Sequence, residues 1–439
     1  MKGGRGKRGR AAAATREATL TIERLGTGGD GIAHLEGRPV FVPFTLPGET
    51  WRVVLQEGGA WRGRPLERLG EPVARAEPSC PHFTRCGGCL LQHLPDPLYD
   101  EFKRQRVIEP LRQARIDHSV PALLARSPQA SRRRVRLAYA RRGGRLLLGY
   151  RALRSHDIVP IATCPISLPV IQDLLPPLTG LLTSLGGEIR EGEVVVTATH
   201  TGLDVRLGGV EARSLEQRER LAAFADTWDL ARLTVASERG AAEAIVTRRP
   251  PVLRFGTTLV TLPLASFLQA TEAGEAALQA AVADWLPDRT RVVDLYAGLG
   301  TLTLPIATRC ERLDLVEGDA DASAACARAI AAYPRLQARC RDLEADPLEA
   351  AELAPFDAAV LDPPRSGAAR QVERLAKASL DRIVYVSCHP GSFARDAQHL
   401  QAAGFELVAL RPVDQFLFAP EVELAALFLR GQAKAKLNA

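Results

Sequence analysis

From about residue 272 the chain alternates between short apolar segments and longer amphipathic ones, and this alternation constrains the fold most strongly. The apolar segments RVVDLYAG, RLDLVEGD, LQARCRDL, FDAAVLDPP and DRIVYVSC resemble strands that are buried on both faces. Helices are predicted at TLTLPIATRC, SAACARAIAAY, ARQVERLAKAS and GSFARDAQHLQAAG. Strands joined by crossover helices run parallel, so a doubly wound α/β domain is expected. The closing segments FELVALRPVDQF and VELAALFLR predict an antiparallel pair.

Acidic residues follow these predicted strands at one edge of the sheet. Glu317, Asp342 and Asp362 end the second, third and fourth strands, and the turn DLYAGLGT follows the first. Gly298 and Gly300 in that turn let the backbone pass close to a ligand. An acid in the place of Glu317 can hold two ribose hydroxyls. The alternative, that these acids are only N-caps of the following helices, would explain one or two of them.

The third glycine of the dinucleotide fingerprint is missing from this turn. The arrangement instead resembles the Rossmann-like methyltransferase fold, which binds S-adenosylmethionine. The expected donor-binding residues in this part of the chain are Tyr296, Gly298, Glu317, Asp342 and Asp362.

Cys388 ends the fifth predicted strand, in IVYVSCHPG. A lone cysteine is usually a small buried side chain, but this one stands at the cofactor edge, before an HPG segment that is expected to turn and aim the thiol outward. A thiolate that adds to carbon 6 of uracil makes carbon 5 nucleophilic enough to accept a methyl group. His389 or Arg365 is expected to favour the thiolate.

A carboxylate is needed to remove the proton from carbon 5. Glu421 and Glu423 are two residues apart in PEVELAAL, so on a strand they would share one face. An acid on an otherwise apolar strand indicates a functional role.

Three cysteines lie within ten residues, in CPHFTRCGGC. Cys80, Cys86 and Cys89 are separated by five residues and then two, and a metal bound by thiolates needs a fourth ligand. The spacing alone leaves zinc and an iron–sulfur cluster open.

Three features of the chain before the predicted methyltransferase domain indicate that the protein binds RNA. The first ten residues hold five Lys or Arg, which indicates a disordered basic tail over 1–14, suited to a polyanion. An OB-like barrel is predicted at residues 15–72. A central α+β domain is predicted at 73–265, followed by the methyltransferase domain at 266–439. Seven Arg lie between 131 and 145, and Arg132 and Arg134 are predicted to contact RNA phosphates.

No apolar run approaches the length of a membrane span, and no secretory signal is visible. We therefore expect a cytoplasmic protein that contacts no membrane. No protein partner is implied by the sequence.

With these residues in view, the chain resembles the bacterial RNA uracil-5-methyltransferase family, close to the members that modify large-subunit ribosomal RNA. The segment GDGIAHLEGRPVFVPFTLPGE resembles a TRAM domain, and CPHFTRCGGCLLQHL resembles the iron–sulfur motif of the family. The resemblance implies a [4Fe–4S] cluster on Cys80, Cys86, Cys89 and Cys164. It also implies that Gln269 in SFLQAT contacts the methyl donor, that Phe267 lies near the target base, that Cys388 is the nucleophile and that Glu423 is the base.

The chain departs from the family pattern at three positions. His389 replaces the usual Asn after the nucleophile, Glu421 replaces a His two residues before the base, and Thr271 replaces an Asn. The extra carboxylate of Glu421 is expected to raise the pKa of Glu423, and it leaves open which of the two glutamates is the base.

The resulting hypothesis is methylation of uracil C5 in RNA, with ribosomal RNA favoured over transfer RNA by family analogy. RNA cytosine-5 methylation shares the thiolate step and stays open, as does a non-catalytic RNA-binding factor. A radical methylthiotransferase would need a three-then-two cysteine spacing, which is absent.

Overall fold

The computed structural model describes residues 16–56, 60–122, 125–186, 189–237, 242–431 and 433. The basic tail predicted at 1–14 lies outside these residues. The chain divides into two compact units. The first comprises the chain up to Pro78 together with Cys89–Phe102, and the second comprises Ser79–Gly88 and the chain from Lys103 onward.

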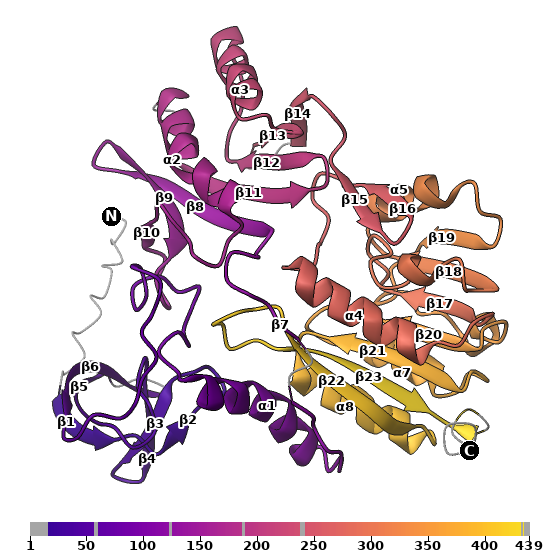
Figure 1. The fold of residues 1–439 in the computed structure, drawn as a ribbon, viewed down its shortest axis with the longest axis horizontal. Helices are drawn as coiled ribbons and strands as arrows, with labels where there is room; N and C mark the ends of the chain where they lie inside the picture. The colour runs from indigo at the N-terminus through magenta and orange to yellow at the C-terminus, as the bar shows by residue number, and fades with distance from the viewer. Residues whose placement is uncertain are drawn as a thin grey trace, which may run out of the picture. The chain divides into compact units, whose positions relative to one another are not determined.

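The first unit contains a six-stranded sheet in the order β1-β5-β6-β4-β3-β2 (Figure 1). Apolar side chains from β1, β3, β4 and β5 form its core. The buried carboxylate of Glu49 accepts hydrogen bonds from the Leu46 amide and the Trp51 indole. The OB-like barrel predicted here is confirmed. Its strands are β1 (Arg16–Thr21), β2 (Arg24–Leu25), β3 (Gly31–Leu35), β4 (Arg38–Val42), β5 (Thr50–Gln56) and β6 (Trp61–Leu69).

The second unit begins with a sheet of seven strands in the order β10-β9-β8-β11-β12-β13-β14, mostly antiparallel. Its apolar face packs against the buried side of α2. The strands are β8 (Arg134–Arg142), β9 (Arg145–Arg151), β10 (Ile158–Pro160), β11 (Glu191–Thr199), β12 (Gly202–Gly208), β13 (Arg232–Ala236) and β14 (Ala242–Thr247). The helices are α2 (Pro169–Ser184) and α3 (Leu215–Thr227), and α1 (Asp96–Gln113) precedes them.

The C-terminal sheet has the order β19-β18-β17-β20-β21-β23-β22-β7. The strands from β19 to β21 are parallel. β22 and β23 form the antiparallel pair that the sequence predicts, and β23 also pairs antiparallel with β21. Because every residue of β23 is buried, both faces of the sheet are covered. The strands are β17 (Arg291–Leu295), β18 (Arg312–Glu317), β19 (Leu336–Cys340), β20 (Ala358–Leu361), β21 (Arg382–Ser387), β22 (Glu406–Asp414), β23 (Glu423–Leu429) and β7 (Ala125–Arg126).

The helices of this part cover both faces of the sheet (Figure 1), so the doubly wound α/β fold is confirmed. They are α4 (Glu272–Trp285), α5 (Ala320–Ile330), α6 (Ala350–Leu353), α7 (Ala369–Leu375) and α8 (Pro390–Ala402), and a small hairpin of β15 (Val252–Phe255) and β16 (Thr258–Thr261) precedes α4.

One predicted helix is wrong. Residues 301–310 form turns around a short 3-10 helix, η1 (Leu304–Ile306), because Pro305 lacks the amide hydrogen that a regular helix would use there. The predicted domain boundaries at 72/73 and 265/266 stay a prediction. Within the described residues, no helix combines the length and the apolar character needed to cross a bilayer.

Candidate active site at the carboxyl edge of the parallel sheet

A cavity of about 740 Å³ opens where the parallel strands end. Loops after β17, β18, β19, β20 and β21 contribute to its walls, together with the start of β23 and the segment before α4. This is the edge at which doubly wound sheets bind ligands. The cavity brings together nine residues predicted from the sequence, namely Phe267, Gln269, Tyr296, Gly298, Glu317, Asp342, Asp362, Cys388 and Glu423.

The loop after β17 takes a backbone conformation that glycine permits. Gly298 and Gly300 have φ of 55° and 73°, and a Cβ on Gly300 would lie 2.7 Å from the side chain of Leu304. Tyr296 also has a positive φ, of 61°, which is uncommon for a residue with a side chain. The Gly298 amide donates to Glu317 Oε2 at 2.8 Å, so the acid that ends β18 holds this loop in place.

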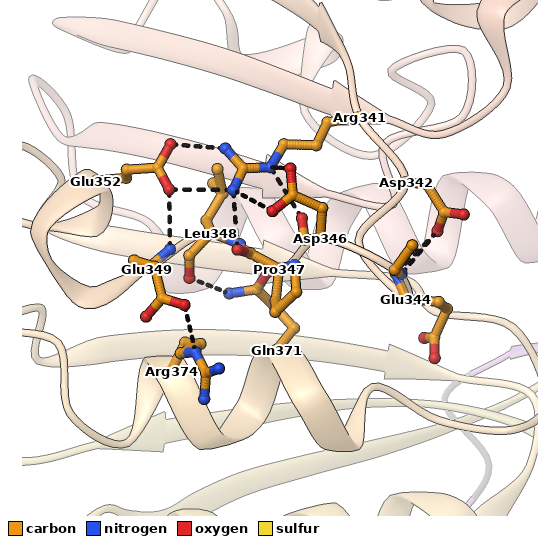
Figure 2. A network of polar contacts seen from close by, with 11 residues as sticks. Arg341, Asp342, Glu344, Asp346, Pro347, Leu348, Glu349, Glu352, Gln371 and Arg374 are labelled. Carbon is orange, nitrogen blue, oxygen red and sulfur yellow. Dashed lines mark hydrogen bonds and ion pairs between the residues drawn. The ribbon is translucent and has the colours of Figure 1, made fainter.

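The loop after β19 carries a second acid of the donor side, Asp342 (Figure 2). Asp342 Oδ1 accepts hydrogen bonds from the amide of Glu344, at 3.0 Å, and from that of Ala345, at 3.2 Å. The Tyr296 hydroxyl donates to Glu344 Oε1 at 3.0 Å. The loops after β17 and β19 are therefore tied to each other beside the cavity.

Arg341 holds the same loop from outside the cavity (Figure 2). Its guanidinium donates to both carboxylate oxygens of Glu352, at 2.7 and 3.2 Å, to the carboxylate and carbonyl of Asp346, and to the carbonyl of Pro347. The buried amide of Gln371 forms two hydrogen bonds with the backbone of Leu348. These contacts fix the chain between Asp342 and α6.

A buried chain of amides connects the donor side with the predicted base. Gln269 Nε2 donates to Asp362 Oδ2 at 3.1 Å. Gln415 Nε2 donates to Gln269 Oε1 at 2.6 Å and to Glu423 Oε2 at 2.8 Å. Sequence reasoning missed Gln415, although a polar residue directly after the buried strand β22 was a signal that could have identified it.

Burial determines the acid–base character of the cavity. It raises the pKa of Glu423, and the nearby charge of Asp362 raises it further, while the hydrogen bond from Gln415 opposes the shift. Burial likewise raises the pKa of Asp362, against the hydrogen bond from Gln269. The pKa of the Cys388 thiol is raised to about 11, first by burial and then by the charges of Glu423 and Asp362, while Arg365 lowers it.

Glu421 does not share a strand face with Glu423, contrary to the prediction. It precedes β23, its side chain is 37% exposed, and its Oε1 lies 3.8 Å from a guanidinium nitrogen of Arg365. The like charge that raises the pKa of Glu423 comes from Asp362, so the expected effect of Glu421 on this pKa is also wrong.

The HPG segment opens a helix instead of forming a turn. His389 is the N-cap of α8, and its Nδ1 accepts a hydrogen bond from the Ser392 amide at 3.1 Å, while Pro390 is the first helical residue. Burial and nearby arginines lower the pKa of His389, which favours a neutral ring. Of the two cations that the sequence suggested for Cys388, Arg365 is the one that lowers its pKa.

The predicted RNA-binding residues have different surroundings. Phe267 lines the cavity with its side chain 68% exposed. Arg134 Nη1 donates to the Ser266 carbonyl, and Arg132 Nε donates to the Arg134 carbonyl at 3.2 Å. Arg134 thus supports the backbone of this cavity wall, Arg132 supports the backbone of Arg134, and the contact of both with phosphates stays a prediction.

The predicted cluster cysteines do not form a metal site in this structure. Among the described residues, no three or more His, Cys, Asp or Glu side chains are grouped so that they could hold a metal ion. Cys80, Cys86 and Cys164 belong to the second unit and Cys89 to the first. Burial raises the pKa of Cys86, and the thiols of Cys164 and Cys80 raise it further.

Two family models match the chain. The TRAM domain model matches residues 15–59, and the model described as tRNA (Uracil-5-)-methyltransferase matches residues 337–431. The second range covers the strands and loops that carry Asp342, Asp362, Cys388 and Glu423.

Relatives match over nearly the full length. An RNA methyltransferase of Caulobacter vibrioides is 40% identical, over 94% of this chain and 99% of that protein. A 23S rRNA (uracil(1939)-C(5))-methyltransferase of Pectobacterium atrosepticum is 34% identical, over 97% of each. The crystal structure of the Pyrococcus abyssi tRNA (uracil-54, C5)-methyltransferase in complex with S-adenosyl-L-homocysteine has a TM-score of 0.74 at 21% identity, over 94% of this chain and 99% of that one, and it shares the fold.

Proposed function

The chain belongs to the RNA uracil-5-methyltransferase family, and we propose that it methylates carbon 5 of a uridine in ribosomal RNA, with S-adenosylmethionine as the methyl donor. The observation that carries the proposal is one cavity that holds a thiol, a buried carboxylate and the acids of a donor site. A module that only bound RNA would need the first unit but no such cavity.

The roles of the two catalytic side chains follow from their chemistry. The Cys388 thiolate forms a bond to carbon 6 of the uracil, and the electron pair of the 5,6 double bond moves onto carbon 5 and the carbonyl. Carbon 5 then bonds to the methyl group of S-adenosylmethionine. The bond between this methyl group and the donor sulfur breaks, and its electron pair remains on the sulfur. Glu423 removes the proton from carbon 5, the double bond re-forms, and the bond between carbon 6 and sulfur breaks to release Cys388.

The charges of the cavity suit these roles. A carboxylate whose pKa is raised by burial is a better base than an exposed one, which favours Glu423 over the half-exposed Glu421. The charges of Glu423 and Asp362 disfavour the thiolate form of Cys388. A positively charged methyl donor beside these two acids would offset their charge and favour the thiolate. Gln269, Tyr296, Gly298, Glu317, Asp342 and Asp362 are assigned to donor binding.

We assign RNA binding to the TRAM domain, to Arg132 and Arg134 and to the exposed ring of Phe267. An uncovered aromatic ring at the mouth of a cavity suits stacking on a base that has left its loop. The ribosomal target rests on the 34% identical relative, whose name specifies 23S rRNA. Such a substrate would place the enzyme in the cytoplasm.

The target can be tested by mass-spectrometric mapping of RNA from a deletion strain. We expect one uridine of large-subunit rRNA to lose its methyl group and to regain it when the wild-type gene, but not the Cys388→Ala gene, is restored. Loss of a methyl group from tRNA alone would transfer the assignment to tRNA, and loss of a methyl group from cytosine would replace the uracil assignment.

The mechanism can be tested with RNA that carries 5-fluorouridine at the mapped site. Fluorine cannot leave as a proton does, so the enzyme should stay bonded to the RNA through Cys388 when the donor is present. A peptide map that finds no linkage to this cysteine would exclude the thiolate route. RNA binding by the Cys388→Ala variant should remain within about threefold of wild type, since one small side chain contributes little to a large interface.

We also propose that Cys80, Cys86, Cys89 and Cys164 hold a [4Fe–4S] cluster. Thiolates suit this group as well as zinc, and the effect of Cys164 and Cys80 on the pKa of Cys86 supports a shared site. The cluster would have a structural role, because methyl transfer moves no net electrons. Protein purified without oxygen should be brown and should contain iron and sulfide, and the Cys164→Ser variant should lose both, whereas stoichiometric zinc in colourless protein would contradict the proposal.

A further inference from the structure

Gln415 connects three elements of the catalytic cavity through one side-chain amide. Its side chain is almost fully buried, with 1% exposed. Its Oε1 accepts the backbone amide hydrogen of Ala270 at 2.9 Å, and its Nε2 donates to Gln269 at 2.6 Å and to Glu423 at 2.8 Å. Both hydrogens of the amide nitrogen therefore have an acceptor.

The orientation of this amide follows from its partners. The Ala270 backbone nitrogen is a donor, so it must face the oxygen of Gln415, and the NH₂ group must then face Glu423 and Gln269. Because the NH₂ group of Gln415 points at Glu423 Oε2, a proton cannot occupy that oxygen on the side that faces Gln415. Within the described part of the chain, Oε1 of Glu423 has no hydrogen bond, and so it is the oxygen available to accept a proton.

The backbone around Gln415 is held on both sides. The buried Lys103 donates to Asp414 Oδ1 at 2.7 Å and to the carbonyls of Phe416, at 3.2 Å, and Glu421, at 2.6 Å. The neighbouring helix α4 also leaves space for the side chain, because a Cβ on Gly274 would lie 2.5 Å from the Cβ of Gln415. The position of the amide is therefore determined by packing as well as by hydrogen bonds.

We propose that Gln415 is a positioning residue for the proton-removal step. It holds Glu423 by Oε2 so that Oε1 receives the carbon 5 proton, and through Gln269 it connects the base to Asp362 on the donor side. This inference rests on the proposed function, since it specifies which oxygen of the base acts and what holds that oxygen. Without this amide, Glu423 would lose the hydrogen bond from Gln415, which favours its ionised form.

The test compares Gln415→Met with Gln371→Met as a matched control. Gln371 is also a fully buried glutamine whose amide forms two hydrogen bonds, but it holds the backbone of Leu348, outside the catalytic cavity. Methionine keeps the length of the side chain and removes its donor. Turnover is measured against pH for each variant, together with the amount of methylated RNA that remains bonded to Cys388 after denaturation.

For Gln415→Met we expect turnover at pH 7 to fall about tenfold or more, as loss of a hydrogen bond to a charged group predicts. Part of this loss should be recovered at higher pH, where Glu423 ionises without assistance. The bonded intermediate should accumulate, because methyl transfer precedes the slowed step. For Gln371→Met the pH profile should match wild type even where the variant is less stable.

The proposal is overturned if Gln415→Met keeps the wild-type pH profile, or if its turnover falls equally at every pH without accumulation of the intermediate. If Gln415→Met does not fold, Gly274→Ala tests the proposal instead. Its added Cβ would lie 2.5 Å from the Cβ of Gln415 and would displace that side chain while retaining its amide. It should give the same pattern more weakly, and a wild-type profile would refute the proposal. A wild-type enzyme without uracil methylation would instead contradict the proposed function itself.

Discussion

Two segments that border the cavity hold their carboxylates in opposite ways. In the donor wall, Arg341–Glu352, the guanidinium of Arg341 pairs with Glu352 in a partly exposed setting (Figure 2), and this hydrogen bond lowers the pKa of Glu352. In the catalytic wall, Asp414–Glu423, the buried Glu423 is held by the neutral amide of Gln415, and burial raises its pKa.

A fixed cation therefore suits one of these walls and not the other. A guanidinium stabilises the carboxylate anion and makes it a poor base, which suits a residue that only holds a loop. A neutral amide orients a carboxylate and leaves it able to take up a proton. The nearby cations of the catalytic wall pair elsewhere, Arg365 with Glu421 and Lys103 with Asp414.

The largest expected effect comes from removing the base itself. Glu423→Gln should lower turnover by about 10³-fold, within the range for general acid–base catalysis, because the carbon 5 proton has no acceptor. Methylated RNA bonded to Cys388 should accumulate and survive denaturation in a gel assay. The oxygen of the new amide can still accept from Gln415, so the wall should keep its structure.

Glu421→Gln is the matched control for that experiment. Its side chain is half-exposed and lies beside Arg365, so turnover should change by less than about threefold, as for other exposed ion pairs. Accumulation of the bonded intermediate in Glu421→Gln, and not in Glu423→Gln, would exchange the two roles and break the contrast between the walls.

The ion pair beneath the catalytic wall should contribute most to stability. Lys103 and Asp414 are both fully buried, and Lys103→Met would leave a buried carboxylate without its cation, at a cost of about 3–5 kcal/mol in the free energy of unfolding. Urea denaturation measures this loss. The double variant Lys103→Met/Asp414→Leu should recover part of it, and a double variant that is less stable than the single one would show that the pair contributes beyond charge compensation.

The two walls should also respond to pH with opposite signs. The folded-state pKa of Glu423 is raised above its usual value of 4.5, so its contribution to stability is complete below that pH and is lost as the pH rises through the raised value. Glu423→Gln should therefore be more stable than wild type in alkaline solution and similar to it near pH 4. For Glu352, whose pKa is lowered, the contribution is present above 4.5 and is lost in acid.

Thermal unfolding of Glu423→Gln and Glu352→Gln across this pH range would measure both signs. Equal pH dependence of the two variants would mean that burial of Glu423 does not control its ionisation. It would also remove the physical reason for choosing Glu423 over Glu421 as the base.

Much of this site could be predicted from the sequence because its residues follow strand ends. The parallel strands bring Glu317, Asp362 and Cys388 to one edge regardless of how their side chains are held, so the pattern of strands was sufficient. The same reasoning placed Glu421 and Glu423 on one strand face, and it was wrong because β23 begins at Glu423. A strand's first residue is set by its pairing partner, which no local pattern reveals.

The hydrogen-bond partners of the site could not be predicted. Gln415 lies 146 residues from Gln269 in the chain, and their contact depends on the packing of α4 against the end of β22. His389 looked like a charge beside the thiol, whereas its ring caps α8. Such roles depend on directions of side chains that only the folded structure fixes.

The smallest expected effect is that of Arg341→Met in the donor wall. Several contacts would be lost, but they are partly exposed, and such ion pairs contribute about 0.2–1 kcal/mol each. Stability should fall by about 1 kcal/mol, and the difference from wild type should shrink at high salt as screening weakens the pairs. Turnover at saturating donor should keep its pH profile, because no group that moves a proton is touched. A shifted profile would show that the donor wall influences the ionisation of Glu423, and the separation between structural cations and catalytic amides would then not hold.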